Sequence, residues 1–166
     1  MAHQFSAKKQ QLYFEQIHTL IKTHGHAIQA ASSEVPWAYT IGLWPKHGYE
    51  IIVFLLDVHI ATAILNSIAH TLNTGRSIPL DTKMPDERGS LNNWVANMPV
   101  LFKQCLPERL LAPDLYVNIA TQYHGQGVPF RQLVLCDKNK RFPGEPGFAD
   151  GVPGMLLQPL LYKSPQ

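Results

Sequence analysis

The chain has 166 residues, of which 45% are hydrophobic and 16% are charged, and its formal net charge is +2. This composition excludes a disordered chain, and the length favours a single domain over residues 1–166. The basic residues are spread out rather than gathered in a patch, so we expect no nucleic-acid partner. The longest apolar run covers residues 51–56, far short of the about 20 residues that cross a bilayer, so we expect no membrane segment.

An amphipathic helix is predicted near the beginning of the chain, over residues 5–23. Apolar side chains recur there at i, i+4, i+7 and i+8, which places them on one helix face: Tyr13, Ile17, Leu20 and Ile21. Gly25 ends the helix, because glycine readily adopts a positive φ beyond the last turn. Residues 1–25 contain no continuous apolar stretch, so we expect no secretory signal.

Three strands are predicted to follow, over residues 26–31, 37–43 and 49–56. A turn-rich segment separates the first two, and residues 44–48 suit a hairpin loop before the third. The third strand is apolar on both faces, which is typical of a buried strand. Connections this short require antiparallel neighbours, because a parallel crossover needs a dozen or more residues.

A second helix is predicted between Asp57, a good N-cap residue, and Gly75. Its apolar positions have helical spacing and comprise Ala61, Ile64, Leu65, Ile68 and Leu72. Residues 76–99 are rich in proline, glycine and asparagine. This composition predicts a long irregular segment, which is suited to contact with a partner.

The remaining elements are shorter. Two strands are predicted over residues 100–102 and 130–136, followed by a turn at 137–140 and a loop over 142–154. Residues 155–162 are predicted as a last edge strand, in which Pro159 limits pairing.

Residues 114–124 fit a helix and a strand equally well, and Asp114 as a cap with Gly125 as a stop favours the helix. Taken together, the elements predict an α+β fold. We expect a mostly antiparallel sheet of about five or six strands with two or three helices packed on one face.

Familiar catalytic motifs are absent from the sequence. It contains no phosphate-binding G-x-x-x-x-G-K-[ST] loop, no dinucleotide G-x-G-x-x-G motif, no G-x-S-x-G elbow and no H-E-x-x-H pair, so no cofactor is predicted. Cys105 and Cys136 are too few for a disulfide framework and indicate free thiols in a reducing compartment. Cys136 is a candidate nucleophile, although a cysteine at a strand end is more often a small hydrophobic residue.

His24 and His26 are candidate metal ligands. Two histidines at i and i+2 of a strand point the same way and can share zinc or another divalent metal. A third ligand would come from His47, Glu50, His59 or His124. The alternative is that His24 stabilises the end of the first helix and His26 is an ordinary surface or core residue.

The strand over residues 37–43 has two different faces. Trp37 and Tyr39 lie on an apolar face, whereas Thr40 and Gly42 lie on a face of small residues. With Trp44, Trp37 and Tyr39 are candidate stacking surfaces for a small molecule. A face of small residues lets a ligand approach closely, which would give a pocket floored by Thr40 and Gly42 with His47 and Glu50 near its mouth. The alternative is that a helix packs on this face.

The strand over residues 130–136 carries two polar residues, Arg131 and Gln132, which we consider candidate ligand-binding residues. A buried arginine needs a paired carboxylate, for which Glu50 and Asp137 are candidates. The alternative is that Arg131 is on a solvated face. Arg141 follows the turn after this strand and completes a set of candidate catalytic residues: His47, Glu50, Asp137 and Arg141.

The order of several short strings resembles a bacterial family known only as domain of unknown function number forty-two sixty-two. Members show AYTIGL, PEL-V, an ILN helix, LQ-V before an aspartate, GRFPW and QPLL. This chain has AYTIGL at 38–43, EIIV at 50–53, ILN at 64–66, QLV at 132–134, Asp137, RFP at 141–143 and QPLL at 158–161.

The resemblance covers residues 25–161. Three positions depart from the family strings: Tyr49 replaces the proline of PEL, Lys140 replaces the glycine before RFP, and Gly144 replaces the tryptophan of FPW. The resemblance implies a bacterial, cytoplasmic α+β protein and implies no activity.

Two functions of different classes follow from these observations. The first is a non-catalytic binding or protein-interaction module, which fits the absence of catalytic motifs and implies a protein partner. The second is a small hydrolase-like or metal-dependent enzyme whose site gathers His47, Glu50, Asp137 and Arg141. A convergence of these four residues in one concave site would favour the enzyme. The sequence does not fix the substrate, the partner or the oligomeric state.

Overall fold

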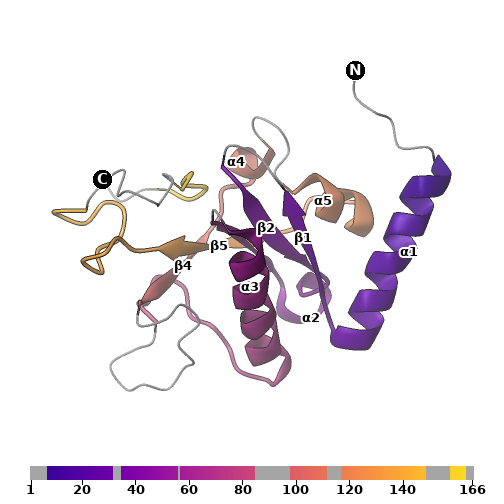
Figure 1. Cartoon of the computed structure of the whole chain (residues 1–166), viewed down its shortest axis with the longest axis horizontal. Coiled ribbons are helices and arrows are strands. Elements are labelled where there is room, and N and C mark those ends of the chain that lie inside the picture. Colours follow the sequence, from indigo (N-terminus) through magenta and orange to yellow (C-terminus); the bar gives the residue numbers. More distant parts are fainter. Residues whose placement is uncertain are drawn as a thin grey trace.

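The computed structural model describes residues 7–31, 35–55, 57–84, 98–111, 117–148 and 158–163 (Figure 1). Its elements, in chain order, are α1 (Ala7–His24), β1 (Ala27–Ala31), β2 (Trp37–Ile41), α2 (Trp44–His47), β3 (Glu50–Phe54), α3 (Val58–Asn73), β4 (Val100–Gln104), α4 (Pro107–Leu111), α5 (Asn118–His124) and β5 (Phe130–Leu135). The five strands form one sheet in the order β1-β2-β3-β5-β4.

The first three strands form the predicted antiparallel meander. β1 pairs with β2, and β2 pairs with β3, through Ala30 opposite Ala38 and Tyr39 opposite Ile52. The connection at residues 44–48 is the short helix α2 rather than a simple loop, and Gly48 ends it with a φ of 86°. This helix positions the backbone beside Glu50, as described below.

β5 lies between β3 and β4, and this position was not predicted. Its pairing with β3 is parallel, with Glu50 opposite Phe130 and Ile51 opposite Arg131, whereas its pairing with β4 is antiparallel. The sheet is therefore mostly antiparallel, as predicted, and has one parallel pair. That pair brings the beginnings of β3 and β5 to the same edge of the sheet, because parallel strands run in the same direction.

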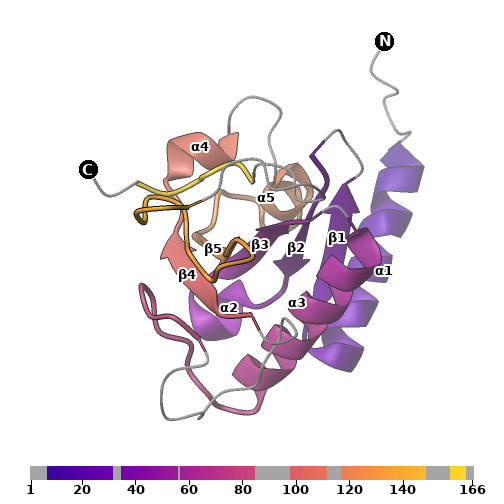
Figure 2. The same cartoon turned by 60° about the vertical axis from the view of Figure 1, so that its left-hand side comes forward.

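Helices cover both faces of the sheet, so the prediction that they share one face is wrong. Figure 2 shows α3 in front of the sheet and α1 behind it. Leu65 and Ile68 of α3 pack on one face against Val53 and Leu133, while Ile17 of α1 and Ala120 of α5 belong to the core on the other face. The described residues form five helices rather than two or three, and two of them, α2 and α4, have only four and five residues.

The predicted ends of the helices agree with the structure. Asp57 caps α3 by accepting hydrogen bonds from the N–H groups of His59 and Ile60 at 2.9 and 3.2 Å. Gly125 follows α5 with a φ of 73°, which confirms the helical interpretation for residues 118–124. Asp114, the predicted cap, lies outside the described residues.

The predicted last strand does not form in residues 158–162. The Gln158 side chain, rather than the backbone of this segment, pairs with β5: its amide accepts from Leu135 N at 3.1 Å and donates to Leu135 O at 2.7 Å. Residues 149–157, with the rest of this prediction and the end of the predicted loop over 142–154, lie outside the described residues, as do residues 85–97 of the predicted irregular segment.

Among the described residues, none of the helices combines the length and the hydropathy that crossing a lipid bilayer requires.

Candidate ligand-binding site

Glu50, the first residue of β3, is completely buried, and its carboxylate receives five hydrogen bonds. Oε2 accepts from Thr40 Oγ1 at 2.7 Å and from Leu43 N at 3.1 Å. Oε1 accepts from Gly42 N at 2.6 Å, from Trp44 N at 3.1 Å and from His124 Nε2 at 3.1 Å.

This network follows from the way β2 ends. Gly42 has a φ of 112°, which turns the chain so that three successive backbone N–H groups face the carboxylate. The Thr40 hydroxyl also accepts from Ile51 N at 2.9 Å, so it links the two strands where their ladder ends. A carboxylate offers about four acceptor sites, and five donors fill them. Glu50 therefore has no capacity left to take a proton from a substrate, and its role is structural.

His124 closes this network from the end of α5. Its side chain is 5% exposed, and its ring lies edge-on to the rings of Trp44 and Tyr123, with centroids 5.2 and 5.3 Å away. Because the carboxylate only accepts, the Nε2–H of His124 is the donor. The contact ties α5 to the β2–β3 connection.

A pocket lies on the face of the sheet that α3 covers, at the edge where β3 and β5 begin. Its volume is about 500 Å³, and its lining comprises His47, Tyr49, Leu72, Gly75, Arg76, Ser77, Ile78, Pro79, Leu80 and Arg131. The parallel pairing of β3 with β5 places Tyr49 beside Arg131. The segment after α3, residues 75–80, contributes the largest continuous part of the lining.

Arg131 is held in a fixed orientation in this pocket. The carbon of its guanidinium lies 3.7 Å from the centre of the Tyr49 ring, and its Nη1 donates to Ile78 O at 3.0 Å. Its Nε is buried and has no hydrogen-bond partner among the described residues. Burial raises the pKa of the Tyr49 hydroxyl, and the positive charge of Arg131 partly offsets this.

The lining of this pocket has a marked charge bias. Arg76 and Arg131 are cationic, His47 is basic, and no aspartate or glutamate is among the described residues that line the pocket. His47 is fixed by a 3.0 Å hydrogen bond between its Nε2 and Asn73 Oδ1 at the end of α3. The arrangement can hold a small, negatively charged group against a planar, oriented guanidinium.

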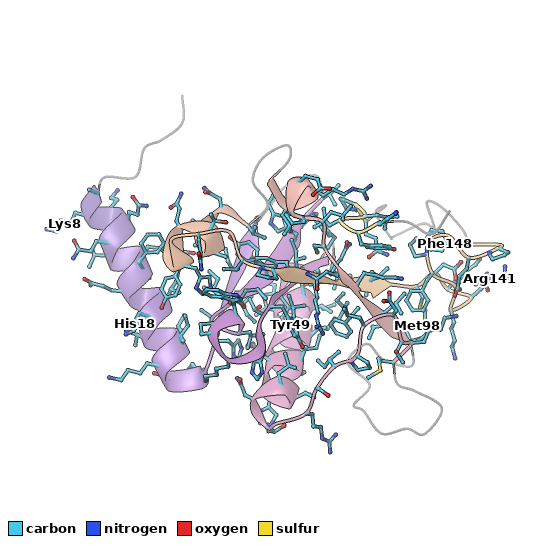
Figure 3. All side chains as sticks on the ribbon, turned by 180° about the vertical axis from the view of Figure 1, so that it is seen from behind. Lys8, His18, Tyr49, Met98, Arg141 and Phe148 are labelled. Atoms are coloured by element: carbon cyan, nitrogen blue, oxygen red, sulfur yellow. The ribbon has the colours of Figure 1, made fainter. Side chains whose placement is uncertain are left out.

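The four candidate catalytic residues lie in three separate places. Glu50 is enclosed in its own network, and His47 lines the pocket. Asp137 accepts from the N–H groups of Asn139 and Arg141 in the turn after β5, six residues beyond Arg131, which corresponds to about 20 Å of strand. In Figure 3, Arg141 lies at the opposite end of the molecule from α1, well away from Tyr49.

The other predicted ligand-binding residues are engaged elsewhere. Tyr39 is buried against Phe130 on the face opposite the pocket, and burial raises the pKa of its hydroxyl. Trp37 packs beside Phe54 on that same face.

Two further candidates, Gln132 and Gly42, contact other residues of this chain where a ligand was expected. The Gln132 amide donates to Pro159 O at 2.8 Å and accepts from Leu161 N at 2.9 Å, which ties the C-terminal segment to the sheet. Gly42 lies against Ile21 of α1, so a helix packs there.

The histidines and cysteines do not form a metal centre in the part of the chain that is described. No group of three or more His, Cys, Asp or Glu side chains is placed there to hold an ion. His26 Nε2 instead lies 2.7 Å from Asn66 Oδ1, and His24 is the last residue of α1. Cys105 and Cys136 are free and buried, and burial raises the pKa of both thiols, that of Cys105 to about 12.

Sequence reasoning missed Tyr49 and Arg76 as site residues. Arg131 itself was found from the sequence, because an arginine is unusual in an apolar strand such as β5. Tyr49 could not be found in this way, since it meets Arg131 only through the parallel pair of strands.

A second and larger cavity, of about 730 Å³, lies between α1, β1 and α5. None of the described residues in its lining is charged, and Gln10 of α1 donates to Gln122 of α5 across it at 3.0 Å. A pocket with a few oriented polar groups is the better candidate for a specific ligand. We therefore place the candidate site at Tyr49 and Arg131.

A comparison with protein families agrees with the suspected resemblance. The family model described as "Domain of unknown function (DUF4262)" matches residues 20–149. Searches of the curated proteins and of the solved structures found no significant match.

Proposed function

The chain belongs to the DUF4262 family, whose description assigns no activity, and from the geometry of the site we propose that it is a non-catalytic binding module with its ligand pocket at Tyr49 and Arg131. The observation that carries this proposal is the fixed guanidinium of Arg131, which is stacked on Tyr49 at 3.7 Å inside a pocket of about 500 Å³. Pockets of this size hold small molecules.

The arrangement of the acidic residues supports binding rather than catalysis. A general base must be within hydrogen-bond reach of the proton it takes and must have a free lone pair. Glu50 has neither free acceptor sites nor exposure, and Asp137 is at the far end of β5. A hydrolase-like or metal-dependent site would need His47, Glu50, Asp137 and Arg141 together, and these residues lie in three places.

The proposal also covers the cellular location of the protein. Two buried free thiols suit a reducing compartment, and we propose the bacterial cytoplasm on this ground together with the family resemblance.

Thermal unfolding in the presence of small molecules tests the proposal. A ligand that binds only the folded protein raises the melting temperature, by an amount that grows with the ratio of the free ligand concentration to the dissociation constant. We expect compounds from a panel of anionic, neutral and cationic metabolites to stabilise the wild-type chain but not Tyr49→Ala or Arg131→Gln. Lys138→Gln, an exposed change after β5, is the matched control and should respond like the wild type.

Two results would contradict this function. In the first, no compound of any charge stabilises the wild type, or the stabilising compounds act equally on both pocket variants. In the second, a stabilising compound is converted to product during incubation with the protein, as followed by NMR, and Arg131→Gln abolishes the conversion. The second result would make the pocket an active site.

A further inference from the structure

We infer that the ligand of this pocket carries a carboxylate or phosphate group, which binds to the guanidinium of Arg131 with Arg76 beside it. The inference rests on the proposed function and adds the chemical class of the ligand. It follows from the charge of the pocket, from the orientation of Arg131 and from one unpaired donor.

The first argument is that Arg131 has no carboxylate partner among the described residues. The printed contacts between oppositely charged or basic and acidic groups there join Lys83 to Glu145, Lys103 to Asp81 and His124 to Glu50, and none of them includes Arg131. A partly buried cation is unfavourable unless an anion compensates it. Glu50 and Asp137, the two expected partners, are both committed to other groups. An anionic ligand would supply the missing charge.

The second argument is the geometry of the guanidinium. Nη1 donates to Ile78 O at 3.0 Å, and the guanidinium carbon lies over the Tyr49 ring, 3.7 Å from its centre, so two contacts hold the group in place. The buried Nε–H has no acceptor, and an unpaired buried donor is unfavourable. An oxygen pair that approaches the side of the guanidinium would satisfy Nε and Nη2 together. Carboxylates and phosphates offer this bidentate geometry.

The third argument is the position of Arg76. It is exposed, and it lines the same pocket as Arg131. A second cation in the lining attracts an anion and adds to its affinity, and salt weakens this contribution at an exposed position. Neutral and cationic ligands gain no charge–charge attraction from either arginine.

Isothermal titration of the wild-type chain with inorganic phosphate, with succinate and with the neutral analogue succinamide tests the inference. We expect at least one of the two anions to bind, and succinamide not to bind. Phosphate alone would identify a phosphate ligand, and succinate alone would identify a carboxylate ligand. Arg131→Gln should weaken the binding of the anion by about ten-fold or more, because it removes a charge-assisted bidentate contact.

Three further variants make the result specific. Arg131→Lys keeps the charge but loses the planar fork, so it should also weaken binding. Arg76→Gln, a change at an exposed residue, should weaken binding several-fold, with a smaller dependence on salt than in the wild type. Lys138→Gln should bind like the wild type at each salt concentration.

The inference is overturned if neither anion binds at millimolar concentration, if succinamide binds as tightly as succinate, or if both Arg131→Gln and Arg76→Gln bind like the wild type. The proposed function can survive this failure. If a neutral compound stabilises the wild type and Tyr49→Ala abolishes the effect, the pocket is a binding site but its ligand is not an anion.

Discussion

The hydroxyl of Thr40 donates to the carboxylate of Glu50 at 2.7 Å and accepts from the N–H of the next residue, Ile51, at 2.9 Å. A single side chain thus closes the β2–β3 ladder and fixes a buried charge. Because the same carboxylate bonds the backbone of residues 42–44 and His124 of α5, it sets the position of Tyr49, which precedes it in the chain. The buried network therefore supports one wall of the pocket without touching the ligand.

Replacing Glu50 with glutamine should destabilise the protein by about 3 kcal/mol, since it removes a buried charge and points an amide N–H₂ at other donors. Whichever oxygen becomes the N–H₂ group meets at least one backbone N–H. Chemical denaturation measures the change. Glu15→Gln, an exposed change on α1, is the control, and a loss for Glu50→Gln as small as that of the control would argue against a structural role.

Gly42→Ala should also be strongly destabilising, by about 3 kcal/mol. Gly42 has a φ of 112°, which side chains rarely adopt, and an added Cβ would lie 2.8 Å from Cγ1 of Ile21. Gly127→Ala provides the comparison, because Gly127 has open space around it and no positive φ. We expect the melting temperature of Gly127→Ala to equal that of the wild type or to be slightly higher. Equal melting temperatures for the two variants would show that α1 does not pack on Gly42 in solution.

Lys140→Gly should stabilise the protein. Lys140 has a φ of 63°, in the left-handed region where a side chain is unfavourable. We expect the free energy of unfolding to rise by about 0.5–1 kcal/mol. The gain is no larger because glycine also increases the conformational entropy of the unfolded chain. Lys138→Gly removes the same charge without a positive φ and should be destabilising, so a loss of stability in both variants would contradict the account.

Alkaline pH should remove a stabilising contribution of Cys105. Burial raises the pKa of its thiol from 9.0 to about 12, so the folded protein keeps the proton that the unfolded chain releases. The contribution is complete below pH 9 and is lost as the pH rises from 9 to 12. The free energy of unfolding, measured across this pH range, should fall more steeply in the wild type than in Cys105→Ala, by up to about 1 kcal/mol per pH unit. Parallel curves for the two proteins would contradict the raised pKa.

Local signals in the sequence were enough to predict most of the elements. The cap at Asp57, the stop at Gly125 and the meander of β1–β3 depend on residues close together in the chain, and all three are confirmed. The distribution of helices over two faces was not predicted, because an amphipathic helix indicates that it packs on a sheet and not on which side.

The candidate site was predicted only in part, for a similar reason. Thr40, Gly42 and Glu50 are close in sequence and do lie together, but as a closed network rather than as the floor of a pocket. Arg131 was noticed because it interrupts an apolar strand. Its neighbours Tyr49 and Ile78 come from distant parts of the chain, and their contacts depend on the parallel β3–β5 pair and on the path of the segment after α3.

The most direct measurement of the central claim is the NMR signal of the Arg131 side-chain Nε–H during a titration with phosphate or succinate. The signal is assigned by comparison with the Arg131→Lys variant, whose spectrum lacks it. We predict a saturable shift of the Arg131 signal with at least one of the anions, and no comparable shift of Arg141 at the far end of β5. An Arg131 signal that stays unchanged, or shifts together with that of Arg141 without saturation, would contradict an anion site at Tyr49 and Arg131.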